Sequence, residues 1–401
     1  MLPAFIRPHP RLALFALLAT ATSGFGQTFF VAVFGGAIRE DLGISHGLYG
    51  SLYSAATLAS ALLLFQAGTL ADRWPLPRLT ALTLAGLAIG CVVMGLSQNP
   101  LMLLLGFFLI RFTGQGMITH LGMTTAGRYF TEQRGKIMAL TACGFPLAEA
   151  LMPLAGALII AGFGWRSAWF FGAGVILLVL LPLLTMLARA ATPQAISTAD
   201  NGATSHAATG WRRDQVRRDS GFYRLLPAVL MVPFTVTAIL FHQSAISDEK
   251  AWPLTLMASA FSGYALGHLA MLAVAGPLVD RLGAQRVLPL LLLPMLVGLL
   301  LLSYGEANWI PLLYLTLIGL SQGGIATASG ALWPERYGTA HLGAIRAMTQ
   351  SIMVFSTAAS PILMGILLDW QVSATHLALG LALLTALACL SAVGVKQAAH
   401  R

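Results

Sequence analysis

A chain of 401 residues with 57% hydrophobic and only 9% charged residues differs from a soluble protein, in which about a quarter of the residues are charged. No soluble fold could bury so much apolar surface, so lipid must be the solvent for much of this chain. The net charge of +9 does not indicate nucleic-acid binding, because the basic residues lie in short segments between apolar runs.

The chain divides into apolar runs that are each long enough, at roughly 20 residues, to cross a bilayer. The first run follows Arg7 and Arg11 and resembles a signal peptide, but it continues to Phe34 and further runs follow, so we interpret it as a span. Division at charges, prolines and polar clusters predicts twelve spans: 11–34, 47–71, 79–97, 100–124, 135–162, 166–188, 222–246, 252–279, 286–304, 309–332, 344–368 and 373–395.

The basic residues predict the orientation of these spans. Of the 23 Lys and Arg, 19 fall on one side of the membrane, including Lys396 and Arg401, and only Arg39, Arg166 and Lys250 fall on the other. The positive-inside rule therefore places both termini in the cytoplasm and indicates a multi-pass protein of the inner (plasma) membrane. Arg111 and Glu149 are the two charged residues left inside spans.

Residues 189–220 interrupt the hydropathy and end in a basic stretch. They predict a cytoplasmic linker between an N-terminal six-helix bundle (1–188) and a C-terminal six-helix bundle (221–401). The basic stretch either lies on the anionic inner leaflet or is a solvated loop that follows the positive-inside rule.

The two halves repeat at an offset of 208 residues. The polar segment Gly68–Arg78 recurs as Gly276–Arg286, and both copies contain the core Gly-x-Leu-x-Asp-Arg. The offset also matches Gly116 with Gly324, Arg128-Tyr129 with Arg336-Tyr337, Thr131 with Thr339 and Pro153 with Pro361. We interpret this as a duplicated six-span unit, related by an axis along the membrane normal.

Twelve spans, a long central loop and G-x-L-x-D-R after the second span resemble the major facilitator superfamily. Gly68, Leu70, Asp72 and Arg73 match that motif, but Pro75, Leu76 and Pro77 replace its next glycine and two basic residues. Arg111-Phe112-Thr113-Gly114-Gln115-Gly116 is similar to the family's fourth-span signature. Gly144–Glu149 departs from the G-P-x-x-G-G of the family's drug/proton antiporters, which places multidrug efflux in doubt. The resemblance implies an all-α polytopic membrane protein with 12 transmembrane helices in two six-helix bundles.

The resemblance also implies a gate at the inner side of the membrane. Asp72 would face the N-terminus of the eleventh span near Gly343, where a carboxylate is favoured by the helix dipole, and would latch the halves in the outward-open state. The alternative is a solvated loop pair that contributes little to stability. The predicted gating residues are Gly68, Asp72, Arg73, Asp280 and Arg281.

Arg111 lies about 16 Å into its span, counted from Pro100 at 1.5 Å per residue. A buried arginine needs a partner or a water-filled cavity, and Gln115 lies one turn away on the same face. We expect Glu149 to be this partner, so that a proton on Glu149 releases Arg111 to bind an anionic substrate. The alternatives are a permanent salt bridge and an inert, protonated carboxyl.

The resemblance implies that spans 1, 4, 7 and 10 line the cavity, which adds Gln27, His242 and Gln322, together with Tyr53 of the second span, as substrate-binding candidates. Polar residues at such spacing are also common as interhelical hydrogen-bonding pairs. The same ambiguity applies to the weaker candidates: Ser23, Tyr49, Thr57, Ser60, His120, His268, Thr349, Ser356 and Ser360.

The sequence predicts a transporter and not an enzyme, because it contains no P-loop, HExxH or G-x-S-x-G motif. Cys91, Cys143 and Cys389 lie in apolar runs without metal-type spacing, so no cofactor or metal is expected. We expect a monomer that moves a small organic anion, such as a monocarboxylate, with protons by alternating access. The alternatives are a proton-linked exporter of drugs or metabolites and a non-transporting receptor or scaffold. The expected partners are the substrate, protons and the bilayer, with no nucleic acid.

Overall fold

The computed structural model describes residues 6–130, 134–191, 210–338 and 340–395. In these residues the regular elements are helices, and an isolated bridge joins Gly210 to Gly338. Much of the linker, together with Lys396, Arg401 and the matched pair Thr131 and Thr339, lies outside the described residues.

The described residues of the first half form eleven α-helices, several of which are pieces of one longer span. They are α1 (Pro10–Thr22), α2 (Thr28–Val31), α3 (Gly35–Leu42), α4 (His46–Ala67), α5 (Leu70–Arg73), α6 (Leu76–Leu96), α7 (Pro100–Ile110), α8 (Thr119–Tyr129), α9 (Arg134–Ala142), α10 (Gly144–Val175) and α11 (Leu181–Ala188). Short 3₁₀ segments, η1 (Ser23–Gly26) and η2 (Ala32–Phe34), and π segments, η3 (Arg111–Ile118) and η4 (Ile176–Leu180), connect some of these pieces.

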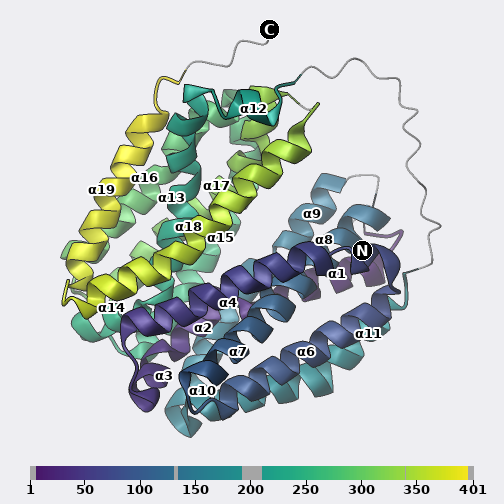
Figure 1. The fold of residues 1–401 in the computed structure, drawn as a ribbon, viewed down its shortest axis with the longest axis vertical. Coiled ribbons are helices and arrows are strands. Elements are labelled where there is room, and N and C mark those ends of the chain that lie inside the picture. Colours follow the sequence, from purple (N-terminus) through teal and green to yellow (C-terminus); the bar gives the residue numbers. More distant parts are fainter. Residues whose placement is uncertain (1–5, 131–133, 192–209, 339, 396–401) are drawn as a thin grey trace.

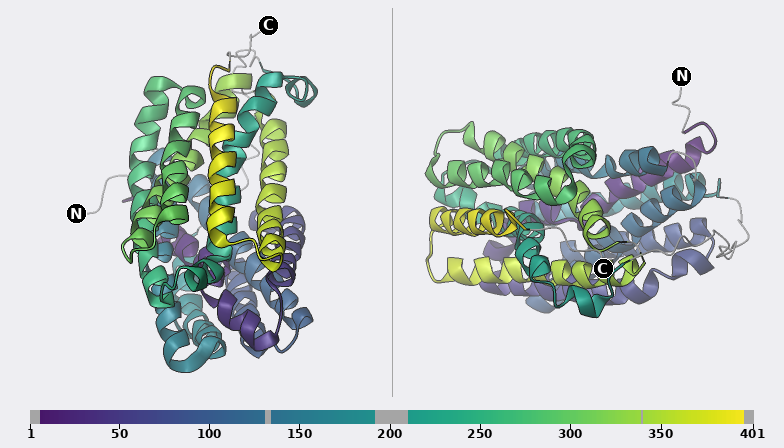
Figure 2. Two further views of the ribbon diagram at one scale, coloured as in Figure 1. Left: turned by 90° about the vertical axis from the view of Figure 1, so that its left-hand side faces the viewer. Right: turned by 90° about the horizontal axis from the view of Figure 1, so that it is seen from above.

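The second half is more regular. It contains α12 (Arg213–Val216), α13 (Ser220–Phe241), α14 (Gln243–Glu249), α15 (Leu254–Leu282), α16 (Ala284–Tyr304), α17 (Ile310–Tyr337), α18 (Leu342–Asp369) and α19 (Ala374–Ala392). The long helices of each half run side by side as a bundle (Figures 1 and 2).

The predicted count of twelve spans is only partly reproduced. Among the described residues, ten helical stretches are long and apolar enough to cross a membrane, or eleven if the bent pair Pro10–Gly26 and Thr28–Leu42 is one span. One of the ten, Gly135–Ala188, has 54 residues, which at 1.5 Å each is about 80 Å and more than twice the hydrocarbon thickness. Its helix breaks at Gly164, whose φ of 80° is left-handed. Counting its two arms separately, and the bent pair as one further span, would give the expected twelve.

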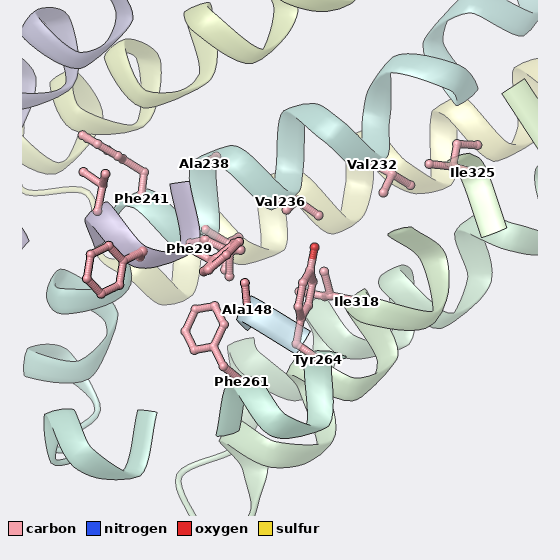
Figure 3. Packing of buried hydrophobic residues seen from close by; sticks show 14 of the residues in the cluster. Phe29, Ala148, Val232, Val236, Ala238, Phe241, Phe261, Tyr264, Ile318 and Ile325 are labelled. Atoms are coloured by element: carbon pink, nitrogen blue, oxygen red, sulfur yellow. The ribbon is translucent and has the colours of Figure 1, made fainter. Parts of the chain in front are cut away.

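The two bundles meet at one end and diverge at the other (Figure 1). We call the end with α3 and α14 the outer end and the end with α9 and α12 the inner end, following the predicted orientation. At the outer end one continuous apolar core joins the halves. Figure 3 shows part of it, where Phe29 of α2 and Ala148 of α10 lie close to Phe241, Phe261 and Tyr264 of the second half.

Candidate functional site

The first span is interrupted near the middle of its length, between Pro10–Gly26 and Thr28–Leu42. Its helix ends in the 3₁₀ turn η1, Gln27 has an extended backbone (φ −84°, ψ 152°), and the two pieces are bent by 41°. Broken helices at membrane depth are tolerated where they are buried in protein or line a cavity, since their free carbonyls need polar partners.

The fourth span is irregular at the same place. Between α7 and α8 the chain forms the π segment η3, a type of helical irregularity that is frequent at functional sites. A β-carbon on Gly26 would lie 2.1 Å from the carbonyl oxygen of Ile110 and 2.5 Å from the amide nitrogen of Gln115. The two interrupted backbones therefore touch, and only glycine fits at position 26.

Arg111 begins the π segment and is only 4% exposed. Its Nη1 donates to the carbonyl oxygen of Gly26 (3.0 Å), which the break in the first span leaves free, and its Nε donates to Thr57 Oγ1 (3.1 Å). The guanidinium also lies 4.9 Å from the ring centre of Tyr53, close enough for a cation–π interaction. All three partners are neutral.

The expected ion pair between Arg111 and Glu149 is not formed. Instead, Glu149 Oε2 lies 2.9 Å from Nδ1 of His268, and both residues are buried. Glu149 is on α10 and His268 on α15, so this pair joins the two halves. The expectation was wrong because span order in the sequence does not reveal which face of the fifth helix turns towards the other bundle.

The other substrate-binding candidates are not all gathered in one place. Tyr53 and Gln27 flank Arg111: the Tyr53 hydroxyl lies 2.8 Å from Thr28 Oγ1, and Gln27 Nε2 donates to Ser23 Oγ (3.4 Å). Gln115 is half-buried in η3. His242 lies at the junction of α13 and α14, where its Nε2 is 2.9 Å from the carbonyl oxygen of Pro361; its neighbour Phe241 packs on the ring of Tyr53, with 4.4 Å between the ring centres.

Gln322 is half-buried on α17, and its amide oxygen has no hydrogen-bond partner within the described part of the chain.

The inner gate contact is absent in this conformation. Asp72 pairs with Arg128 of its own half, and among the described residues no atom outside the neighbouring backbone of α18 lies within 4 Å of a β-carbon built on Gly343. The carbonyl of Gly68 lies 3.1 Å from Nε2 of His120. Arg73, Asp280 and Arg281 are exposed.

The outer end holds a contact that the sequence did not reveal. The Asp369 carboxylate, at the end of α18, accepts hydrogen bonds from the backbone amides of His46 and Gly47 (2.9 Å each), the first residues of α4. A β-carbon on Gly50 would lie 2.4 Å from the carbonyl oxygen of Pro361, so α4 and α18 are in direct backbone contact.

A sequence model described as Major Facilitator Superfamily matches residues 16–244 and again 225–399. Together these matches cover nearly the whole chain. The protein belongs to the major facilitator superfamily. Its family and fold show a multi-pass membrane transporter and not an enzyme, as the sequence predicted.

Solved structures support the same fold. The nucleoside transporter NupG superposes with a TM-score of 0.70 at 13% identity, over 96% of this chain and 98% of that one. A bacterial homologue of the human lysosomal transporter Spinster, described as inward-facing and unoccupied, gives a TM-score of 0.66 at 14% identity, over 98% and 95% of the two chains. No curated protein sequence matched this chain.

Proposed function

We propose that this superfamily member is a proton-coupled transporter of a small organic anion resembling a monocarboxylate, and that Arg111 binds the carboxylate. The observation that carries the proposal is the environment of Arg111. It is a buried cation whose partners are a carbonyl, a hydroxyl and an aromatic ring, and no carboxylate lies within ion-pair distance among the described residues.

A buried charge without a counter-ion is unfavourable, and a substrate carboxylate would supply the missing negative charge through charge-assisted hydrogen bonds. Gln27, Tyr53 and Gln115 would contact the rest of the substrate. His242 and Gln322 remain candidates on the opposite bundle.

Glu149 is the proposed proton acceptor, with His268 as its partner. Both side chains belong to ionisable residue types, both are buried, and they lie on opposite sides of the interface between α10 and α15. Gain or loss of a proton changes the strength of this contact and thereby the closure of the halves. This route replaces the one in which Glu149 releases Arg111.

The anion assignment is tested with purified protein in liposomes, by measuring uptake of labelled carboxylates. Loss of a charge-assisted hydrogen bond costs about 2 kcal/mol or more, so Arg111→Ala should lower uptake by roughly 30-fold or more. Arg286→Ala, which removes an exposed arginine, is the matched control. Normal carboxylate transport by Arg111→Ala would remove the anion assignment.

Proton coupling is tested separately with an imposed pH gradient. Glu149→Gln should retain substrate exchange but lose accumulation driven by the gradient, because the amide cannot bind the proton. Full accumulation by this variant would eliminate the coupling role, and the absence of both activities in a folded variant would assign Glu149 a structural role.

A second candidate is a polar, uncharged solute such as a nucleoside. It is favoured by the buried, unpartnered amide oxygen of Gln322 and agrees with the fold shared with NupG. Competition of labelled carboxylate uptake by unlabelled nucleosides separates the two. The same liposomes, loaded with substrate, test export.

We further propose that the protein is a monomer in the inner membrane with both termini in the cytoplasm, and that the linker 189–220 separates its two six-helix bundles.

A further inference from the structure

An apolar groove of about 430 Å³ opens on the second half, between α13, α18 and α19. It is distinct from the surroundings of Arg111, which belong to the first half. Its walls include Pro227, Leu230, Phe234, Ser356, Leu387 and Ser391. Leu384 and Leu387, which form the α19 wall, are 50% and 53% exposed, so this wall faces the lipid in a bilayer.

The groove begins at the inner end and reaches the middle of the membrane. Ser391 lies one residue before the end of α19, whereas Phe234 lies ten residues beyond Arg224 along α13. At 1.5 Å per residue, Phe234 lies about 15 Å from Arg224, which is one leaflet of a hydrocarbon core about 30 Å thick, and the groove residues Pro227–Phe234 cover about 10 Å of that length. The apolar lining of the groove suits part of one acyl chain of the inner leaflet, with the headgroup at the level of Arg224.

A fixed cation stands at the mouth of the groove. The exposed guanidinium of Arg224 donates from Nε to the carbonyl oxygen of Ser391 (3.2 Å) and from Nη2 to that of Val393 (3.0 Å). These bonds hold it beside Ser391, a wall residue, and its Nη1 has no hydrogen-bond partner among the described residues.

The surroundings of Arg224 are strongly basic. Four further arginines in and beside α12 are exposed: Arg212, Arg213, Arg217 and Arg218. Two carboxylates are nearby in sequence, but Asp219 is already bonded to Arg336, which leaves Asp214 as the exposed acid. The Tyr223 side chain is 55% exposed and its hydroxyl donates to the carbonyl of Arg217 (3.0 Å), as expected of an aromatic residue at the membrane interface.

We propose that this groove is a binding site for one anionic phospholipid of the cytoplasmic leaflet, with an acyl chain between α13 and α19 and the phosphate on Arg224. Guanidinium groups suit phosphate oxygens, and basic residues beside membrane helices attract anionic lipids. The bilayer supplies the ligand, and a soluble anion would gain nothing from the apolar walls. The assignment depends on the basic end facing the cytoplasm, as the positive-inside rule predicts.

The site also has a consequence for transport, because its third wall is α18. The outer end of this helix carries Asp369, which caps α4 of the other half. A lipid seated in the groove would contact α18 and α13 at once, so the anionic lipid content of the inner leaflet would influence how easily α18 moves.

A purely structural role for Arg224, capping the last carbonyls of α19, is the alternative. The two roles are separated by filling the groove without changing the arginine. Leu387→Trp adds bulk to the groove wall, and Leu383→Trp adds the same bulk to an exposed position of α19 that does not line the groove.

The experiment is native mass spectrometry of the full-length protein titrated with phosphatidylglycerol or phosphatidylcholine. We expect one tight phosphatidylglycerol per protein and weaker binding of phosphatidylcholine. Arg224→Gln should weaken the tight site about fivefold and Leu387→Trp should abolish it, whereas Leu383→Trp and Arg78→Gln should bind as wild type does.

Equal binding of the two lipids would overturn the proposal. So would a wild-type lipid count in Leu387→Trp, because the arginines of α12 would then suffice without the groove. Unchanged binding by Arg224→Gln would leave that residue as a helix cap only and would likewise contradict the proposed phosphate contact.

Discussion

At the outer end, the carboxylate of Asp369 caps the N-terminus of α4 in the opposite half. At the inner end, the carboxylate of Asp72 is bonded to Arg128 in its own half. Each end therefore has a carboxylate, but the outer carboxylate binds the opposite half and the inner carboxylate binds its own half. In this conformation the halves are joined at the outer end and separated at the inner end.

The two acids are related by the geometry of α4 and α18. Each helix starts at the end where the other finishes, so the acid that ends one can cap the beginning of the other. Asp369 ends α18 and caps α4, and Asp72 follows the end of α4 and would cap α18 near Gly343 when the inner side closes. We infer that alternating access exchanges one cap for the other.

Blocking the backbone contact of α4 with α18 should have the largest effect. Gly50→Leu would place a side chain against the carbonyl of Pro361 and prevent outer closure, so transport should fall below detection. Spin labels on cysteines at Arg189 and Arg213 should report a shorter distance across the inner end. Gly380→Leu, in open space on α19, is the control, and an unchanged distance in Gly50→Leu would contradict the role of this contact.

Weakening the outer cap should have a smaller, graded effect. Asp369→Asn removes the negative charge at the start of α4, which is favoured by about 0.3–1 kcal/mol, so the ratio of the outward-closed to the outward-open population should fall by roughly two- to fivefold. The same spin-label distances measure these populations. A variant with wild-type distances would show that the apolar contacts alone keep the outer end closed.

Asp72→Asn should shift the populations in the opposite direction. Its present partner contributes little, because both side chains are substantially exposed (65% for Asp72 and 38% for Arg128). If Asp72 caps α18 in the other state, its loss disfavours that state and increases the outward-closed population. The double variant with Asp369→Asn should return towards the wild-type ratio, and a shift of Asp72→Asn in the same direction as Asp369→Asn would exclude the exchange of caps.

Much of the architecture could be predicted because it depends on hydropathy and repetition. Arg111 and Glu149 were recognised as intramembrane charges for the same reason, and both are buried. Their partners could not be predicted, because the sequence does not reveal which helix faces meet. His268 was a weak candidate until the structure placed it on α15 opposite Glu149.

The breaks in the spans were also invisible in the sequence. The first span bends at Gln27 without a proline, and the π segment that starts at Arg111 is continuous in hydropathy. Gly26 and Gly114 mark the place where the two spans meet, because a β-carbon on either would lie within about 3 Å of the other span's backbone. Such a close approach depends on tertiary packing, which local composition does not encode.

The smallest effect is expected for a cap that lies within one half. Glu249 accepts hydrogen bonds from the backbone amides of Ala374 and Thr375, at the start of α19. It therefore caps a helix as Asp369 does, but both partners lie in the second half, so this contact does not link the two bundles. Burial alone would raise the pKa of Glu249, but these hydrogen bonds outweigh it and lower the pKa below the ordinary glutamate value. Its contribution is present above that ordinary value and is lost as the pH falls through the lowered pKa.

Glu249→Gln should therefore lower the free energy of unfolding at neutral pH by no more than about 0.3–1 kcal/mol, because Glu249 is exposed and its charge is screened. In acid the difference from wild type should vanish. The spin-label distances should not change, because the bond does not cross between the bundles. A shift as large as that of Asp369→Asn would mean that any helix cap at the outer end controls the populations. The exchange of caps between the two halves would then no longer explain why the outer and inner ends differ.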